Sequence, residues 1–167
     1  TLYTGITAAR RVRLHYRIAV ALEQLPGTGR RPLRELAYHF GQASVYRGAE
    51  KALDYATRAG DQASSALAME DAARCYELAL RALDLLSRGP ERNETRFDLH
   101  ARRGRSFFQI GQWAQAKAAF ESALSLLDPQ ADARRCELLV SMSEASFWLM
   151  DLAALRRYAG EAQELAD

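Results

Sequence analysis

A pattern of small and aromatic residues that recurs three times is the feature that most constrains how this chain can fold. It is clearest in one copy, whose positions are Gly104, Phe107, Gly111, Ala116, Phe120 and Ala123. Copies that start at Gly60 and Met142 keep the same offsets, with Tyr76 and Tyr158 as the second-helix aromatic residues. The third copy departs from the pattern at Glu161. Self-similarity of this length indicates a helical repeat.

The spacing predicts pairs of helices that pack side by side. Small residues such as Gly104 and Ala116 would let two helices approach closely, and the rings of Phe120, Tyr76 and Tyr158 would fill the space between successive pairs. Since one pair cannot bury both of its faces, neighbouring pairs must stack. Between the Gly and Pro breakers we expect helices over residues 7–25, 32–46, 49–66, 69–87, 92–110, 113–127, 131–149 and 151–166.

The predicted fold is therefore all-α, a right-handed superhelical array of about eight antiparallel helices in one domain over residues 1–167. Its four helix pairs are 7–46, 49–87, 92–127 and 131–166. Composition agrees, because 49% of the residues are apolar and no apolar run reaches the ~20 residues of a membrane span. The chain begins at Thr1 without an initiator methionine or a targeting segment, so we expect it to be a fragment of a longer protein.

Residues 97–129 resemble the tetratricopeptide repeat, whose pattern is W-x2-L-G-x2-Y, then A-x3-F, then P. The residues that match this pattern are Gly104, Phe107, Ala116, Phe120 and Pro129. His100 stands where the tryptophan is usual and Arg103 where the leucine is usual, so the repeat is degenerate. The resemblance implies the stacked helix pairs described above.

The N-terminal half is similar to a helical region of large bacterial regulators. The similar stretches read ARRVRLHYRIAVALEQLPG, RELAYHF and AEKALDYATRAGDQASSALAMEDAARCYELALRAL. In LuxR-type transcriptional activators with a signal-transduction (STAND) ATPase core, such a region follows the ATPase and winged-helix parts. The resemblance implies a cytoplasmic sensor arm that receives an inducer or a partner protein. Nucleic acid would then be bound only by other domains of the full-length protein.

The sequence carries no signature of catalysis or of cofactor binding. It lacks a glycine-rich phosphate loop and the H-E-x-x-H, G-x-S-x-G and C-x-x-C motifs. The neighbouring carboxylates Glu70 and Asp71 fall at a helix start, where the macrodipole favours negative charge. For His39 we expect one ring nitrogen to be bonded across a helix interface. Cys75 and Cys136 lie in helical patterns and are expected to be free thiols. We therefore predict no enzyme, no metal and no cofactor.

Seven arginines near the N-terminus could contact phosphates. They are Arg10, Arg11, Arg13, Arg17, Arg30, Arg31 and Arg34. The whole chain has a formal net charge of only +2, and Glu23 and Glu35 lie close to the cluster in sequence. We favour a solvated face or a docking surface for an upstream domain over a nucleic-acid site.

The first helix of each pair is expected to line the inner surface of the array. In the best repeat the residues on that stripe are Asp98, Ala101, Arg105, Phe108 and Gln109. In the next pair they are Cys136, Leu139, Ser143, Ser146 and Phe147. Arg105 could hold a carboxylate with two hydrogen bonds, and Phe108 and Phe147 could supply apolar contacts. The alternative is that these phenylalanines pack against the neighbouring helix.

The last helix has an apolar stripe that includes Leu152, Leu155 and Leu165, and no polar cap covers it. This stripe predicts either further repeats or a homodimer that pairs through this face. Together these features favour a non-catalytic module that binds a protein, a peptide or a small-molecule effector and senses a signal for a transcriptional regulator. The alternative is a structural scaffold or self-association module with no effector.

Overall fold

The computed structural model describes residues 7–25, 32–87, 89–128 and 130–166. These residues form helices and no strand, which confirms the all-α prediction. The helices are α1 (Ala8–Gln24), α2 (Leu33–Ala43), α3 (Ala49–Ser65), α4 (Met69–Asp84), α5 (Pro90–Gln109), α6 (Trp113–Leu124), α7 (Asp132–Trp148) and α8 (Leu152–Glu164). Each expected helix is present, with ends that agree within three residues. Arg30, Arg31 and Pro129 lie outside the described residues.

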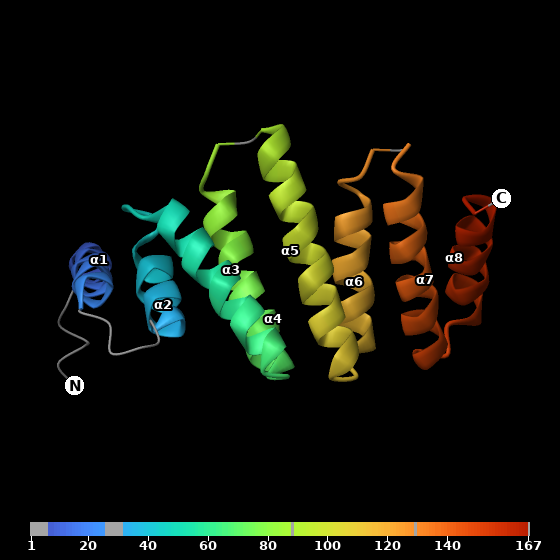
Figure 1. Cartoon of the computed structure of the whole chain (residues 1–167), viewed down its shortest axis with the longest axis horizontal. Helices are drawn as coiled ribbons and strands as arrows, with labels where there is room; N and C mark the ends of the chain where they lie inside the picture. The colour runs from blue at the N-terminus through green and yellow to red at the C-terminus, as the bar shows by residue number, and fades with distance from the viewer. Residues whose placement is uncertain (1–6, 26–31, 88, 129, 167) are drawn as a thin grey trace.

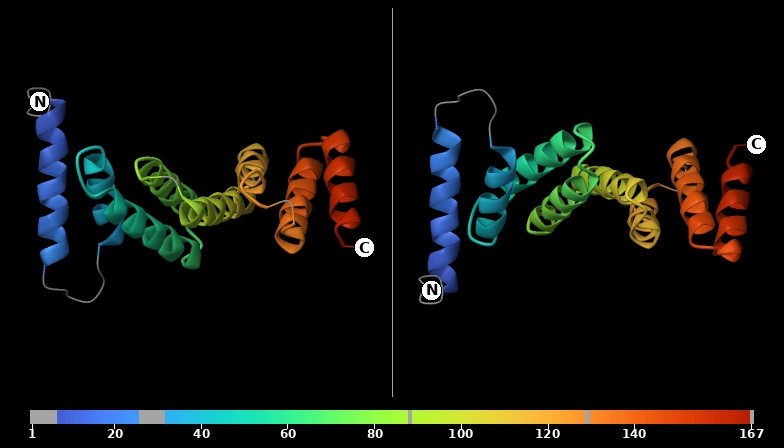
Figure 2. Two further views of the ribbon diagram at one scale, coloured as in Figure 1. Left: turned by 90° about the horizontal axis from the view of Figure 1, so that it is seen from above. Right: turned by 90° about the horizontal axis from the view of Figure 1, so that it is seen from below.

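The helices lie in a row, and each packs against the next one in the chain (Figure 1). From α3 to α8 their directions alternate, as expected for stacked antiparallel helices. Helix α1 differs in direction from these helices, because it is seen end-on in Figure 1 and lengthwise in Figure 2, where it lies beside α2. The antiparallel pair expected over residues 7–46 stays a prediction, and α1 and α2 do pack against each other. The two helices contact where His15 and Tyr16 meet His39 and Phe40.

Two glycines explain the small-and-aromatic pattern physically. A Cβ atom added to Gly104 would lie 2.5 Å from the ring of Phe120, and one added to Gly60 would lie 2.6 Å from the ring of Tyr76. Both rings are almost fully buried. We expected these rings between successive helix pairs, but their closest packing is within a pair, because a glycine without a Cβ lets the ring lie directly on the facing helix.

The third copy of the pattern is shifted by one residue in its first helix. After α3, Leu67 has a positive φ, and the next residue, Ala68, donates its N–H to the carbonyl oxygen of Ala63. After α5, Gly111 has a positive φ, and Gln112 donates to the carbonyl oxygen of Phe107 in the same way. After α7, the equivalent bond runs from Asp151 to Ser146, 2.9 Å away. Ser146, and not Ala145, thus occupies the repeated position, while the turn before α8 has three residues, as do the turns before α4 and α6.

Buried side chains form two clusters that meet at α5. The first cluster joins α1 to α4 and includes Leu99 of α5. The second joins α5 to α8 and includes Phe97 and Ala101. Helix α5 thus places side chains in both clusters, at alternate positions of its sequence. That the whole chain is a single domain stays a prediction. No helix of the described ranges has the length and apolar character to cross a bilayer.

A pair of histidines joins α1 to α2. The two Nδ1 atoms of His15 and His39 lie 2.9 Å apart, so one ring donates a hydrogen bond and the other accepts it. His15 is buried and His39 half-buried. The expectation that a His39 nitrogen is bonded across a helix interface is confirmed. Burial and the neighbouring His15 lower the pKa of His39, against a smaller opposing effect of Glu35.

The free energy of unfolding is expected to fall as the pH drops below about 6.5. Burial also lowers the pKa of His100, helped by Arg103 and Arg96. Because both pKa values lie below those of the unfolded chain, unfolding takes up protons. This stability is complete above the unfolded-state pKa and is lost as the pH falls from there through the lower folded-state pKa. Urea unfolding between about pH 8 and about pH 5 measures the loss. The variant His39→Gln should show a smaller loss of unfolding free energy between these pH values. A pH profile equal to that of the natural chain would show that His39 does not contribute to the loss.

Candidate functional site: a groove and an aromatic pocket on α5 and α7

A groove of about 730 Å³ lies between α5 and α7. Phe97 and Arg105 line it from α5, Cys136 and Leu138 line it from α7, and Phe120 contributes from α6. The α7 side also carries Arg134, which pairs with Glu94 and lies 3.8 Å from the centre of the Phe97 ring. The lining mixes apolar side chains with the charged groups of Asp98, Arg105, Asp132, Arg134 and Glu137, and a binding groove combines apolar surface with placed polar groups in this way.

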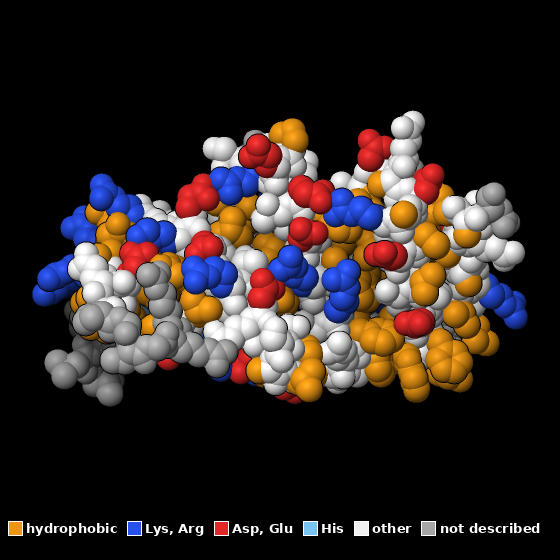
Figure 3. Space-filling view, viewed as in Figure 1, with side chains coloured by type: hydrophobic (Ala, Val, Ile, Leu, Met, Phe, Trp, Pro, Cys, Tyr) orange, Lys and Arg blue, Asp and Glu red, His pale blue; other side chains and the backbone are white. Residues whose placement is uncertain are grey.

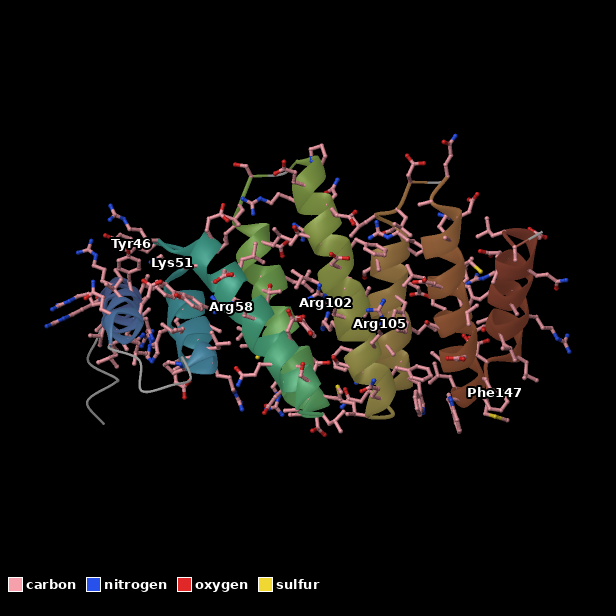
Figure 4. The ribbon with its side chains drawn as sticks, in the orientation of Figure 1. Tyr46, Lys51, Arg58, Arg102, Arg105 and Phe147 are labelled. Atoms are coloured by element: carbon pink, nitrogen blue, oxygen red, sulfur yellow. The ribbon has the colours of Figure 1, made fainter. Side chains whose placement is uncertain are left out.

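Arg105 is the exposed cation of this groove that makes no ion pair with another described residue. Basic side chains lie in a row across the face seen in Figure 4, namely Lys51, Arg58, Arg102 and Arg105. Within this row, Lys51 pairs with Glu23, Arg58 with Asp54 and Arg102 with Asp61. Arg105 is therefore available to an external carboxylate, which its guanidinium can hold with two hydrogen bonds.

A second pocket of about 390 Å³ lies at the other end of α7. Its lining residues are Phe108, Ser143, Glu144, Phe147, Trp148 and Leu155. Trp148 stacks on Trp113 at a centroid distance of 5.3 Å, and Phe108 meets Trp113 edge to face at 4.9 Å. Phe147 and Trp148 are 53% and 57% exposed. We call this the aromatic pocket.

Hydrophobic side chains continue outward from the aromatic pocket. Met150, in the turn that joins α7 to α8, is 77% exposed, and Leu152, the first residue of α8, is 56% exposed. The space-filling view shows hydrophobic side chains gathered at this end of the molecule (Figure 3). A contiguous exposed apolar patch on a protein marks an interaction surface.

The structure separates the predicted groove residues into several environments. Asp98 and Arg105 line the groove, whereas Phe108, Ser143 and Phe147 line the aromatic pocket. Gln109 is exposed and lines neither of them. Ala101, with Leu139 of the next pair, is buried in the second cluster, so the prediction that these two residues face a ligand is wrong. The reason is that α6 and α8 cover this side of the first helices.

The predicted self-association stripe on α8 does not form one face. Leu152 is exposed, Leu155 lines the aromatic pocket, and Leu165 lines the groove while packing on the second cluster. Leu165 lies at the opposite end of α8 from Leu152, so no single flat surface presents all three side chains.

The predicted arginine cluster is also divided. Arg10, Arg11, Arg13 and Arg17 are exposed on α1, and Arg13 lies over the ring of Tyr46. Arg34 instead pairs with Asp71 of α4, at 2.8 Å. An arginine already held by a carboxylate is less available to a phosphate.

Sequence reasoning missed Trp113, Trp148 and Glu144. These residues lie near helix ends and outside the repeated pattern. The signal that could have found the tryptophans is their position beside short turns, since Trp113 begins α6 and Trp148 ends α7. Sequence reasoning likewise did not pair His15 with His39.

The fold and its surfaces define a row of helices with a mixed groove and an apolar pocket. Within the described ranges, no three or more His, Cys, Asp or Glu side chains come together to hold a metal ion. Cys75 is a buried free thiol whose pKa is raised by that burial, and Cys136 is a half-buried one. No protein-family model matches the chain, and no curated protein matches it.

Proposed function

We propose that the chain is a non-catalytic, tetratricopeptide-like binding module whose groove holds an acidic segment of a protein or peptide partner. The observation that carries this proposal is Arg105, an exposed cation that makes no ion pair with another described residue and lines a mixed groove of about 730 Å³. The glycine and aromatic packing in successive helix pairs supports a right-handed superhelical array. The similarity of the N-terminal half supports a sensor role in a cytoplasmic bacterial regulator of the LuxR type.

In this proposal the partner's carboxylate pairs with Arg105, and its apolar side chains lie against Val140, which lines the groove and is 44% exposed. Among the acidic groups around the groove, Arg134 holds Glu94 at 2.8 Å and Asp98 at 3.7 Å, whereas Asp132 and Glu137 also line the groove and make no ion pair with another described residue. Binding would favour one arrangement of the helices and so bias the attached ATPase and DNA-binding parts. A small-molecule effector with a carboxylate would use the same contacts.

Removal of the Arg105 side chain should weaken binding of an acidic peptide about tenfold, since a hydrogen bond to a charged group contributes about 1.5–3 kcal/mol. We suggest titrating the peptide Ac-Leu-Glu-Leu-Glu-amide by calorimetry into the natural chain and into Arg105→Ala. The matched control is Arg102→Ala on the same helix, because Arg102 is already paired with Asp61 at 2.7 Å. Equal affinity in Arg105→Ala and the natural chain would remove Arg105 from the site.

The alternative proposal is a structural scaffold or a homodimer with no effector. The exposure of Met150 and Leu152 beside the aromatic pocket favours it. Sedimentation over about a hundredfold range of concentration separates the two, because a dimer forms by mass action. A dimer that Leu152→Glu disperses, with no peptide binding, would support the alternative.

A further inference from the structure

We propose that the aromatic pocket binds an arginine or lysine side chain of a protein partner, flanked in that partner by apolar residues. This is a second site, distinct from the groove at Arg105. It rests on three observations: rings over which no described residue places a cation, a carboxylate that pairs with no other described side chain, and an apolar surround.

The rings of this pocket lack the cations that cover rings elsewhere. Arginine or lysine side chains of the chain itself lie over Phe40, Tyr46, Tyr55, Phe97, Phe107 and Tyr158. Among the described residues, none lies over Phe108, Trp113, Phe147 or Trp148. Tryptophan has the ring face most favourable to a cation. The pocket therefore offers an unused site for a positive charge that must come from another molecule.

Glu144 supplies the matching negative charge. It lines the aromatic pocket and is exposed. It makes no ion pair or hydrogen bond with another side chain in the described parts of the chain. The nearby carboxylate of Asp151 differs, because it accepts a hydrogen bond from the N–H of Ala154 and pairs with Lys117. A carboxylate beside exposed aromatic faces is complementary to a guanidinium or ammonium group, which makes a charged hydrogen bond and stacks at once.

The surroundings of the pocket indicate a protein segment and not a small free cation. Met150 and Leu152 extend the apolar surface beyond the pocket. A free ammonium compound would leave this surface in water, whereas the apolar neighbours of an arginine or lysine in a peptide would cover it. The expected partner is thus a segment in which a basic residue stands between large apolar residues.

Tryptophan fluorescence tests the proposal directly, because Trp148 lines the aromatic pocket and Trp113, the other tryptophan of the chain, stacks on it. The probes are Ac-Leu-Arg-Leu-amide and Ac-Leu-Gln-Leu-amide, added to the 167-residue chain. The arginine peptide should give a saturable spectral change and bind about tenfold more tightly than the glutamine peptide. Glu144→Gln should remove most of that difference, and Glu144 is exposed, so the fold should be retained, as circular dichroism can verify.

Two further measurements separate this site from the groove and from self-association. Arg105→Ala should leave the affinity for the arginine peptide within about twofold, because Arg105 does not line this pocket. Equal binding of the two peptides, no effect of Glu144→Gln, or no spectral change with either peptide would overturn the proposal. So would a dimer in sedimentation that Trp148→Ala dissociates and that the arginine peptide fails to compete with.

Discussion

Replacing Gly104 with valine is expected to lower the free energy of unfolding by about 3 kcal/mol. A Cβ atom at this position would lie 2.5 Å from one ring carbon of Phe120 and 2.6 Å from the next, and the Phe120 ring is itself nearly fully buried. The ring has no empty space to enter, so either the helices separate or the ring leaves its rotamer. Unfolding in urea, followed by circular dichroism, measures the change.

Gly160 provides the matched control. It also lies inside a helix, but a Cβ atom there would meet no atom within 4 Å. Gly160→Ala should therefore raise the stability by about 0.5–1 kcal/mol, through helix propensity alone. Combining Gly104→Val with Phe120→Leu should cost less than the sum of the two single changes, because the second removes the ring that the first strikes. Strict additivity would show that the ring is not the cause.

Truncation of Phe40 to alanine is expected to lower the free energy of unfolding by about 4 kcal/mol. Phe40 is fully buried, stacks on Tyr55 at a centroid distance of 5.6 Å and meets Tyr16 edge to face. Its ring therefore joins α1, α2 and α3, and the cavity left behind cannot be filled by one neighbour moving. Denaturant unfolding gives the size of the loss.

Hydrogen exchange shows where that loss is felt. Phe40 belongs to the first buried cluster, so amides of α2 and α3 should lose more protection than amides of α7 and α8. Val45→Ala is the control, because Val45 is 81% exposed and should change stability by less than about 0.5 kcal/mol. Equal loss of protection throughout the chain would show that the two clusters unfold as one unit.

Much of the fold was predictable because its determinants are local. Helix positions follow from apolar periodicity and from breakers such as Gly111, which adopts a positive φ in the structure. The match of Gly104 with Phe120 was visible as well, since the two lie only sixteen residues apart and are joined by one short turn. Spacing across such a turn leaves few ways for two helices to face each other.

The direction of α1 relative to the later helices and the division of the binding stripe were not predictable in the same way. The contact of His15 with His39 depends on how two helices meet in space, which periodicity does not encode. Ala101 shares the stripe of Arg105 in sequence, yet its small side chain is covered, whereas the long guanidinium of Arg105 reaches solvent. Position on a helix face alone does not decide which side chain is accessible.

The two-sided character of α5 has a consequence for communication along the molecule. Leu99 packs with the first cluster, while Phe97 and Ala101, two positions to either side, pack with the second. Because α5 contributes side chains to both buried clusters, a rotation of α5 that improves its packing in one cluster worsens its packing in the other. A ligand that fixes the orientation of α5 by binding Arg105 would thus change the packing of α1 to α4 through the rigid helix, without a change in any loop.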